Sequence, residues 1–244
     1  MKFILKEPIF IGNELSQSIT EKKVYNDLKK NGFTVVRNFC KNPSDVVNVL
    51  KKYWNHKNAW QDDVKSDTRL FGIDHKVKYF ENFFLKNKML INIYKKYINS
   101  SKISSLIMAN RVLPKKNNIG SGGKWHRDDK DGRQLKFILY LTDVKPNNGG
   151  FNYLKYTHKP INRIFNSIQM GCGINTWNFT QDHVNKLSSK YEFVDVTGKA
   201  GDLIIVDTSG IHKGSPIYSG SRIALTQYLW DKNEIPEAVK VQMI

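Results

Sequence analysis

The sequence has few of the features that mark secreted or membrane proteins. Its 244 residues include only two cysteines, Cys40 and Cys172, which are too few for a disulfide framework although they could form one bridge. No apolar run approaches the roughly 18 residues that a membrane-spanning helix needs. Charged residues interrupt the N-terminal segment too early for a secretory signal. We therefore expect a cytoplasmic protein without a membrane span.

Acidic residues are also scarce. The chain has 22 Asp and Glu against 39 Lys and Arg, a formal net charge of +17. The lysines are spread along the chain as pairs, for example Lys22-Lys23 and Lys115-Lys116, and form no single basic block. A positive field concentrates anionic ligands near the protein, so we expect a small anionic substrate such as a nucleotide-linked sugar or an acyl thioester. Nucleic acid stays open as a partner, but we find no recognised binding motif for it.

The order of hydrophobic patterns predicts the fold class. Helical patterns occupy segments 20–30, 42–53 and 81–99. Strand-like patterns follow at 103–113, 135–141, 151–155, 191–196, 203–206 and 223–230. This order predicts a mainly β fold with flanking helices, a double-stranded β-helix (a cupin-like jelly roll). We expect one domain over residues 1–244, in which a helix-rich part (about 1–100) packs on the jelly roll (about 101–232).

Three residues of metal-ligand type stand in an order that indicates chemistry. His126 and Asp128 are two residues apart next to a predicted strand, so both side chains can lie on the same side of the chain. His212 follows the predicted strand 203–206. Two histidines and one carboxylate can occupy one face of an octahedral metal and leave the other face open, as in non-haem Fe(II) oxygenases. The same three ligands also suit a zinc enzyme.

Other residues are candidates for binding a co-substrate or substrate. Arg222 opens the last predicted strand, ten residues after His212, where its guanidinium could pair with a carboxylate. Lys136 and Tyr140 share one face of the strand 135–141 and could contact a ligand if that face lines the pocket. Asn110 is a further candidate, on the strand before the His-x-Asp segment. Trp125, next to His126, could form a wall of the pocket.

These motifs resemble one known family. The segment from Trp125 to Lys159, with His126-Arg127-Asp128, Asn148-Gly149-Gly150 and His158-Lys159, looks like the phytanoyl-CoA dioxygenase group of Fe(II)/2-oxoglutarate oxygenases. The segments 201–222 and 32–39 are similar to the distal-histidine region and the opening strand of that family. This sequence departs from the family at Gly214, where many members have a hydroxyl residue. It also departs at Tyr156-Thr157, where Gly-Ser is common, and at Ile138, where an aromatic residue is common. None of these three departures affects the predicted metal ligands.

The resemblance implies an activity and its cofactors. His126, Asp128 and His212 would bind Fe(II), and Arg222 would hold the far carboxylate of 2-oxoglutarate. With O2 the enzyme would hydroxylate an unactivated C–H bond of a small molecule. Because halogenating relatives lack the carboxylate ligand, Asp128 favours hydroxylation, or another oxidation such as desaturation or cyclisation. Two alternatives remain: oxidative demethylation of nucleic acid or nucleosides, and a non-catalytic jelly-roll binding protein. The sequence indicates neither the substrate nor the oligomeric state.

Overall fold

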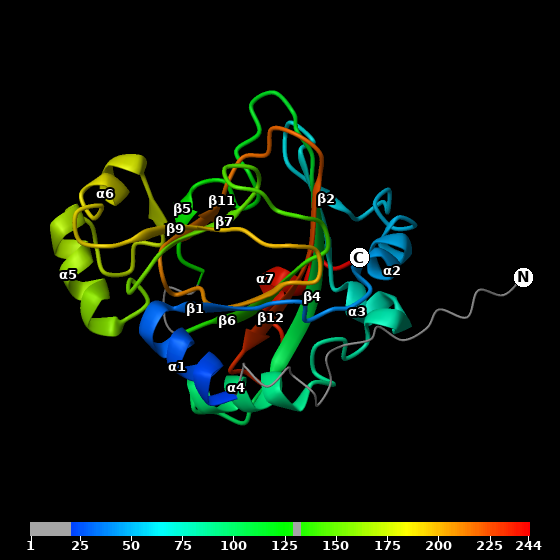
Figure 1. Cartoon of the computed structure of the whole chain (residues 1–244), viewed down its shortest axis with the longest axis horizontal. Helices are drawn as coiled ribbons and strands as arrows, with labels where there is room; N and C mark the ends of the chain where they lie inside the picture. The colour runs from blue at the N-terminus through cyan, green and yellow to red at the C-terminus, as the bar shows by residue number, and fades with distance from the viewer. Residues whose placement is uncertain (1–20, 129–132) are drawn as a thin grey trace, which may run out of the picture.

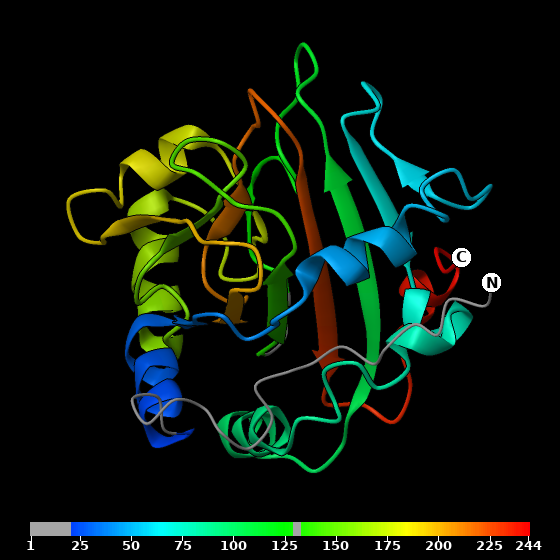
Figure 2. The same cartoon turned by 45° about the vertical axis from the view of Figure 1, so that its right-hand side comes forward.

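Two antiparallel β-sheets form the centre of the molecule (Figures 1 and 2). The computed structural model describes residues 21–128 and 133–244. The strands are β1 (Phe33–Val36), β2 (Trp60–Gln61), β3 (Asp67–Phe71), β4 (Ser104–Val112), β5 (Trp125–His126), β6 (Leu135–Tyr140), β7 (Phe151–Leu154), β8 (Asn178–Phe179), β9 (Phe193–Val196), β10 (Leu203–Asp207), β11 (His212–Gly214) and β12 (Arg222–Trp230). The large sheet has the order β1-β10-β6-β12-β4-β3-β2, and the small sheet the order β8-β5-β11-β7-β9.

Helices cover the outer faces of both sheets. They are α1 (Glu21–Asn31), α2 (Pro43–Leu50), α3 (Ile73–Lys76), η1 (Lys78–Phe80), α4 (Lys88–Ile98), α5 (Pro160–Met170), α6 (Gln181–Asn185) and α7 (Glu237–Lys240). Helices α1, α2 and α4 pack on the large sheet, whereas α5 and α6 lie over the small sheet (Figure 1). In residues 21–128 and 133–244, no helix is long and apolar enough to cross a membrane.

Side-chain alternation on the strands divides the core into layers. On β6, Phe137 and Leu139 pack into the cluster beneath the helices, together with Leu28 of α1 and Leu90 of α4. Ile138, one position away, packs between the two sheets. This pattern confirms the predicted alternation on β6 and the predicted mainly β jelly-roll class. The N-terminal part contributes strands to the large sheet as well as helices, because β1 pairs with β10 and β3 pairs with β4.

Two sequence predictions differ from the structure. The helix predicted over residues 81–99 begins only at Lys88, because Asn82 has a positive φ and Asn87 caps the helix by accepting a hydrogen bond from Leu90 N. The composition of Asn147-Asn148-Gly149-Gly150 predicts a β-hairpin turn, but the turn at Asn147, where φ is 54°, joins strands of different sheets.

Candidate metal centre and its pocket

The two predicted histidine ligands lie directly opposite each other in the small sheet. His126 on β5 is the register partner of His212 on β11, so both imidazoles project from the same face of the sheet. Their ring centroids are 4.3 Å apart. In each ring Nδ1 contacts a backbone carbonyl, of Lys124 at 2.7 Å and of Gly210 at 2.9 Å. These contacts orient both rings with Nε2 free to bind a metal.

Asp128 completes the cluster. Its Oδ1 lies 3.8 Å from Nε2 of His126, and its Oδ2 lies 3.3 Å from Nε2 of His212. The possible ligand atoms of these three residues are all within 4.8 Å of one another. The Asp128 amide donates to the carbonyl of Thr208 at 3.0 Å, which anchors the segment after β5. Two imidazole nitrogens and one carboxylate so arranged can hold a divalent transition metal and leave coordination positions open.

Lys136 forms an ion pair with the predicted metal ligand Asp128. Its Nζ lies 2.8 Å from Oδ2 of Asp128 and 3.9 Å from the ring centroid of Tyr228. Burial alone would lower the pKa of Lys136, but the facing carboxylate raises it above its usual value. Burial likewise opposes ionisation of Asp128, but Lys136, followed by the two histidines, holds the pKa of Asp128 well below its usual value. The carboxylate is therefore ionised and available as a ligand.

The histidine on β5 stays neutral over a wide pH range. Burial, and then the neighbouring His212, lower the pKa of His126 to about 4. Because a metal binds the neutral imidazole, protons compete little for this nitrogen near neutral pH. The charge states of the cluster, as well as its geometry, therefore suit the binding of a metal cation.

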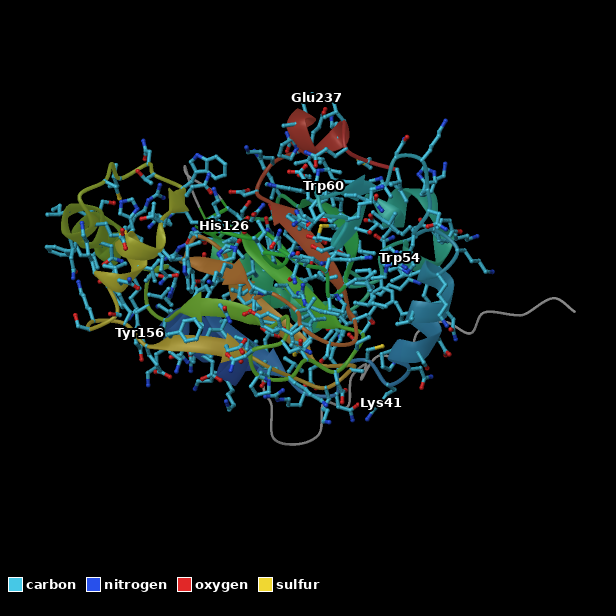
Figure 3. All side chains as sticks on the ribbon, turned by 90° about the horizontal axis from the view of Figure 1, so that it is seen from above. Lys41, Trp54, Trp60, His126, Tyr156 and Glu237 are labelled. Atoms are coloured by element: carbon cyan, nitrogen blue, oxygen red, sulfur yellow. The ribbon has the colours of Figure 1, made fainter. Side chains whose placement is uncertain are left out.

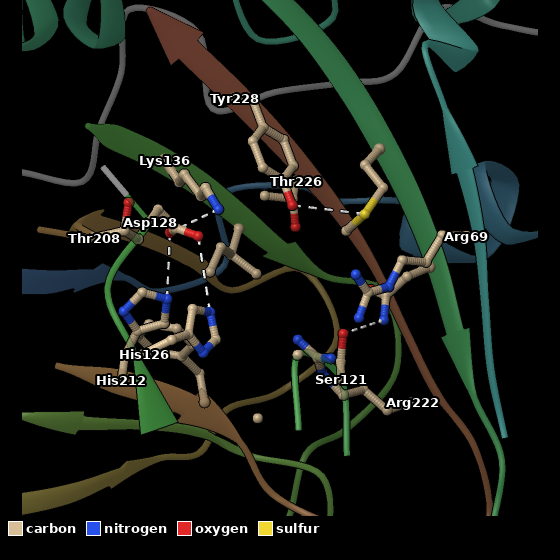
Figure 4. A pocket seen from close by; sticks show the side chains of 16 residues that line it. Arg69, Ser121, His126, Asp128, Lys136, Thr208, His212, Arg222, Thr226 and Tyr228 are labelled. Carbon is tan, nitrogen blue, oxygen red and sulfur yellow. Dashed lines mark hydrogen bonds and ion pairs between the residues drawn. The ribbon is translucent and has the colours of Figure 1, made fainter. Parts of the chain in front are cut away.

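A cavity of about 120 Å³ extends from the cluster between the two sheets. Figure 4 shows the two histidines, Asp128 and Lys136 on one side of it and Arg69 and Arg222 on the other. Its wall is formed by Arg69, Met108, Asn110, Ser121, Gly122, His126, Asp128, Lys136, Ile138, Phe151, Thr208, His212, Gly214, Arg222, Thr226 and Tyr228. Of the four sequence candidates for ligand binding besides the metal ligands, Arg222, Lys136 and Asn110 line the cavity, whereas Tyr140 does not.

Arg222 is buried, and its Nε has no hydrogen-bond partner among the described residues. Its guanidinium carbon lies 5.5 Å from the ring centroid of Tyr140. The Tyr140 hydroxyl is occupied elsewhere: it donates to the carbonyl of Val196 at 2.8 Å and accepts from the amide of Phe151 at 3.1 Å. Tyr140 therefore supports the arginine with its ring and offers no polar group to the cavity. A buried cation of this kind favours an anionic ligand in the cavity.

The sequence interpretation missed Arg69, a second cavity arginine on β3. Its Nε and Nη2 donate to Asp67 at 2.8 and 2.7 Å, and its guanidinium lies 4.5 Å from the ring centroid of Trp60. Ser121 was also missed; its hydroxyl accepts a hydrogen bond from Asn110 Nδ2 at 3.1 Å. No spacing rule links either residue to the His-x-Asp motif. Only the pairing of β3 with β4 brings Arg69 to the pocket.

The prediction that Trp125 forms a wall of the pocket is wrong. Its side chain packs on the opposite face of β5, among the residues beneath α5 and α6, and its Nε1 donates to Gln181 Oε1 at 3.1 Å. The alternation that directs His126 into the cavity directs its neighbour outward. Trp54 and Trp60 lie on the other side of His126 from Tyr156 (Figure 3), and neither lines the cavity.

Comparisons with known proteins agree with this geometry. The family model described as phytanoyl-CoA dioxygenase (PhyH) matches residues 28–224. No curated protein matches the chain significantly.

Several solved structures have a similar fold. One is the epimerase SnoN from nogalamycin biosynthesis, in complex with Fe³⁺, α-ketoglutarate and nogalamycin RO. It has a TM-score of 0.66 and 12% identity, and the alignment covers 86% of this chain and 83% of SnoN. The carbocyclase SnoK from the same biosynthesis has a TM-score of 0.64 and 12% identity, with 97% and 94% covered. HygX from Streptomyces hygroscopicus, with nickel, 2-oxoglutarate and hygromycin B bound, has a TM-score of 0.59 and 13% identity, with 86% and 87% covered.

Proposed function

Because the chain belongs to the phytanoyl-CoA dioxygenase family, we propose that it is an Fe(II)- and 2-oxoglutarate-dependent oxygenase acting on a C–H bond of a small molecule. The observation that supports this most is the position of the His126, Asp128 and His212 cluster in the same cavity as the buried Arg222. The first three residues would hold Fe(II). When bound, Fe(II) with 2-oxoglutarate and O2 supplies the oxidation of an unactivated C–H bond, with release of succinate and CO2.

Arg222 would bind the carboxylate of 2-oxoglutarate farthest from the metal. Its Nε is unpartnered and buried, so an incoming carboxylate would satisfy a donor that otherwise carries a desolvation cost. Tyr140 would hold the guanidinium in place from behind. Asn110 and Ser121 would contribute polar atoms to the wall, and Gly214 adds no side chain beside them.

Lys136 would fix the carboxylate ligand. Its ammonium lies 2.8 Å from Oδ2 of Asp128, and this ion pair would hold the carboxylate between the two imidazoles. A carboxylate held in this way would bind the metal through one oxygen and keep other positions open for the co-substrate.

The substrate would be a small, anionic metabolite that enters from the mouth of the cavity. The +17 net charge supports an anionic substrate. The cavity of about 120 Å³ is smaller than the ~300–1,000 Å³ of typical ligand sites, so a larger substrate would lie outside it. The carboxylate ligand Asp128 favours hydroxylation over halogenation. Because similar structures include an epimerase and a carbocyclase, the assay must also detect products other than alcohols.

The test is succinate formation from 2-oxoglutarate by the Fe(II)-loaded protein in air, with pools of anionic metabolites and with methylated oligonucleotides. Product masses separate the reactions: one added oxygen for hydroxylation, loss of two hydrogens for desaturation or cyclisation, and no change for epimerisation. His212→Ala should abolish succinate formation, whereas His75→Ala, which changes an exposed histidine outside this cavity, should not. Activity on oligonucleotides alone would favour demethylation. Equal activity of both variants would contradict the proposal.

A further inference from the structure

Helix α5 buries mainly polar side chains, and Met170 is its one buried hydrophobic residue. Asn166 and Ser167 are buried, and Oδ1 of Asn166 accepts a hydrogen bond from the Tyr191 hydroxyl at 2.7 Å. Asn162 Nδ2 donates to the carbonyl of Tyr156 at 2.9 Å. These polar contacts attach the helix to the protein over the small sheet. A helix of a globular protein usually buries its apolar side instead.

The outward side of α5 is apolar. Ile161, Ile164, Phe165 and Ile168 have spacings of three and four residues, so they form one stripe. Phe165 is 52% exposed and Ile168 is 72% exposed. In the described part of the chain, half of the large exposed hydrophobic residues lie between residues 161 and 177. Contiguous apolar patches of this kind mark interaction surfaces.

Basic residues predominate in the part of the sequence that carries this apolar surface. Between residues 155 and 192 the sequence has five Lys and Arg and two carboxylates, Asp182 and Glu192, of which Glu192 is paired with Lys155. Lys190 on the segment after α6 lies with its Nζ 5.7 Å from the ring centroid of Phe165. An amphipathic helix with aromatic and aliphatic residues on one face and lysines beside it is typical of proteins that lie on a membrane surface.

We propose that the α5 surface (Ile161, Ile164, Phe165, Ile168) binds peripherally to an anionic phospholipid bilayer. The stripe would enter the boundary between headgroups and acyl chains, and the neighbouring lysines would contact the anionic headgroups. The surface is the outward face of a helix and is separate from the cavity between the sheets, because none of its four residues lines that cavity. Contact between two copies through this face would bring lysines of both chains together, which disfavours self-association.

The proposal is independent of the metal centre. Helix α5 lies over the outer face of the small sheet (Figure 1). His126 and His212 instead line the cavity on the inner face of that sheet. Substitutions on this surface should therefore change membrane binding and leave turnover of 2-oxoglutarate unchanged.

The test is co-sedimentation of the full chain with vesicles of phosphatidylcholine alone or mixed with phosphatidylglycerol. The wild type should bind the mixed vesicles and not the neutral ones. Phe165→Ser with Ile168→Ser keeps the net charge of +17 and should weaken binding at least about tenfold. Tyr218→Ser with Val241→Ser removes two hydrophobic residues elsewhere that are at least as exposed, and it should leave binding unchanged.

Two results would overturn the proposal. If the α5 variant binds the mixed vesicles as the wild type does, then net charge alone causes the binding and the apolar stripe has no part in it. If the wild type does not bind vesicles but forms a dimer in sedimentation velocity that the α5 variant loses, the surface is an interface with a second copy. Thermal unfolding of the variants checks that they are folded, since all four substituted side chains are exposed.

Discussion

Replacement of Lys136 by methionine tests the electrostatics of the proposed metal centre. Nζ of Lys136 lies 2.8 Å from Oδ2 of Asp128, and only 8% of the lysine side chain is exposed. Methionine has a similar length and no charge, so Lys136→Met keeps most of the packing and removes the cation. Asp128 would then face the two histidines without its ammonium partner.

The expected loss of stability follows from the burial of the pair. Removing one partner of a buried ion pair costs about 3–5 kcal/mol. Because 19% of the Asp128 side chain is exposed, the lower value of about 3 kcal/mol applies. For a chain of this size 1 kcal/mol corresponds to about 2–4 °C in Tm. The metal-free variant should therefore unfold about 6–12 °C below the wild type.

A bound metal should reverse much of this loss. A divalent cation would pair with Asp128 in place of the ammonium, and it would no longer be repelled by Lys136. Since the metal-free state is destabilised more than the metal-bound state, the variant should bind metal more tightly. A difference of about 1.4 kcal/mol between the two states corresponds to a tenfold change in affinity, and we expect at least that.

The assay is thermal unfolding of metal-free and Ni²⁺-loaded protein, with Ni²⁺ titration for the affinity. Lys213→Met is the matched control, because Lys213 follows His212 directly but its Nζ lies 4.7 Å from the ring centroid of Trp125, on the outer face of the small sheet. The control should show no gain in metal affinity. Equal destabilisation of Lys136→Met with and without Ni²⁺ would refute this electrostatic account. Weaker Ni²⁺ binding would refute it too, since it would mean that the orientation of Asp128 by Lys136 outweighs the repulsion between Lys136 and the metal.

Three further changes have distinct expected outcomes. Tyr140→Phe should lower the free energy of unfolding by about 1–3 kcal/mol, because the groups bound by its hydroxyl are buried. Its affinity for 2-oxoglutarate, measured by isothermal titration, should change little; a large loss would mean that the hydroxyl contacts the co-substrate. Gly214→Ser should lower Tm by several degrees, because a Cβ there would lie 2.1 Å from the Ser121 carbonyl oxygen; an unchanged Tm would contradict this close packing. Burial lowers the pKa of His158, so the unfolded state binds more protons and stability falls as pH drops through about 6.5. His158→Gln should remove this part of the pH dependence, which amounts to at most about 1.4 kcal/mol of unfolding free energy per pH unit. Denaturant unfolding at pH 7 and pH 5 should therefore show that the variant loses less stability on acidification than the wild type.

The sequence predicted the features that depend on local spacing. The two-residue separation of His126 and Asp128 and the alternation of Lys136 with Phe137 both follow from strand geometry, and the structure agrees with both. Arg222 was expected at the pocket from its ten-residue spacing to His212 and from the family resemblance, and it lines the cavity. Such features need no knowledge of how distant segments pack.

Features that depend on tertiary packing were not predictable. Arg69 reaches the cavity only because β3 pairs with β4, and nothing in the sequence around it marks that pairing. The ion pair of Lys136 with Asp128 likewise depends on the approach of β6 to the segment after β5. The pattern of α5 indicates an amphipathic helix, but periodicity alone cannot tell which side is buried, and here it is the polar side with Asn166.

The most direct test of the proposed cofactor site is the visible spectrum of the metal-free protein after anaerobic addition of Fe(II), with and without 2-oxoglutarate. The assignment of His126, Asp128 and His212 as iron ligands predicts a weak charge-transfer band that appears only with both additions. The band should be absent in His212→Ala and much weaker in Arg222→Ala. Absence of the band in the wild type, together with tightly retained zinc, would contradict the oxygenase assignment and favour a hydrolytic or binding function.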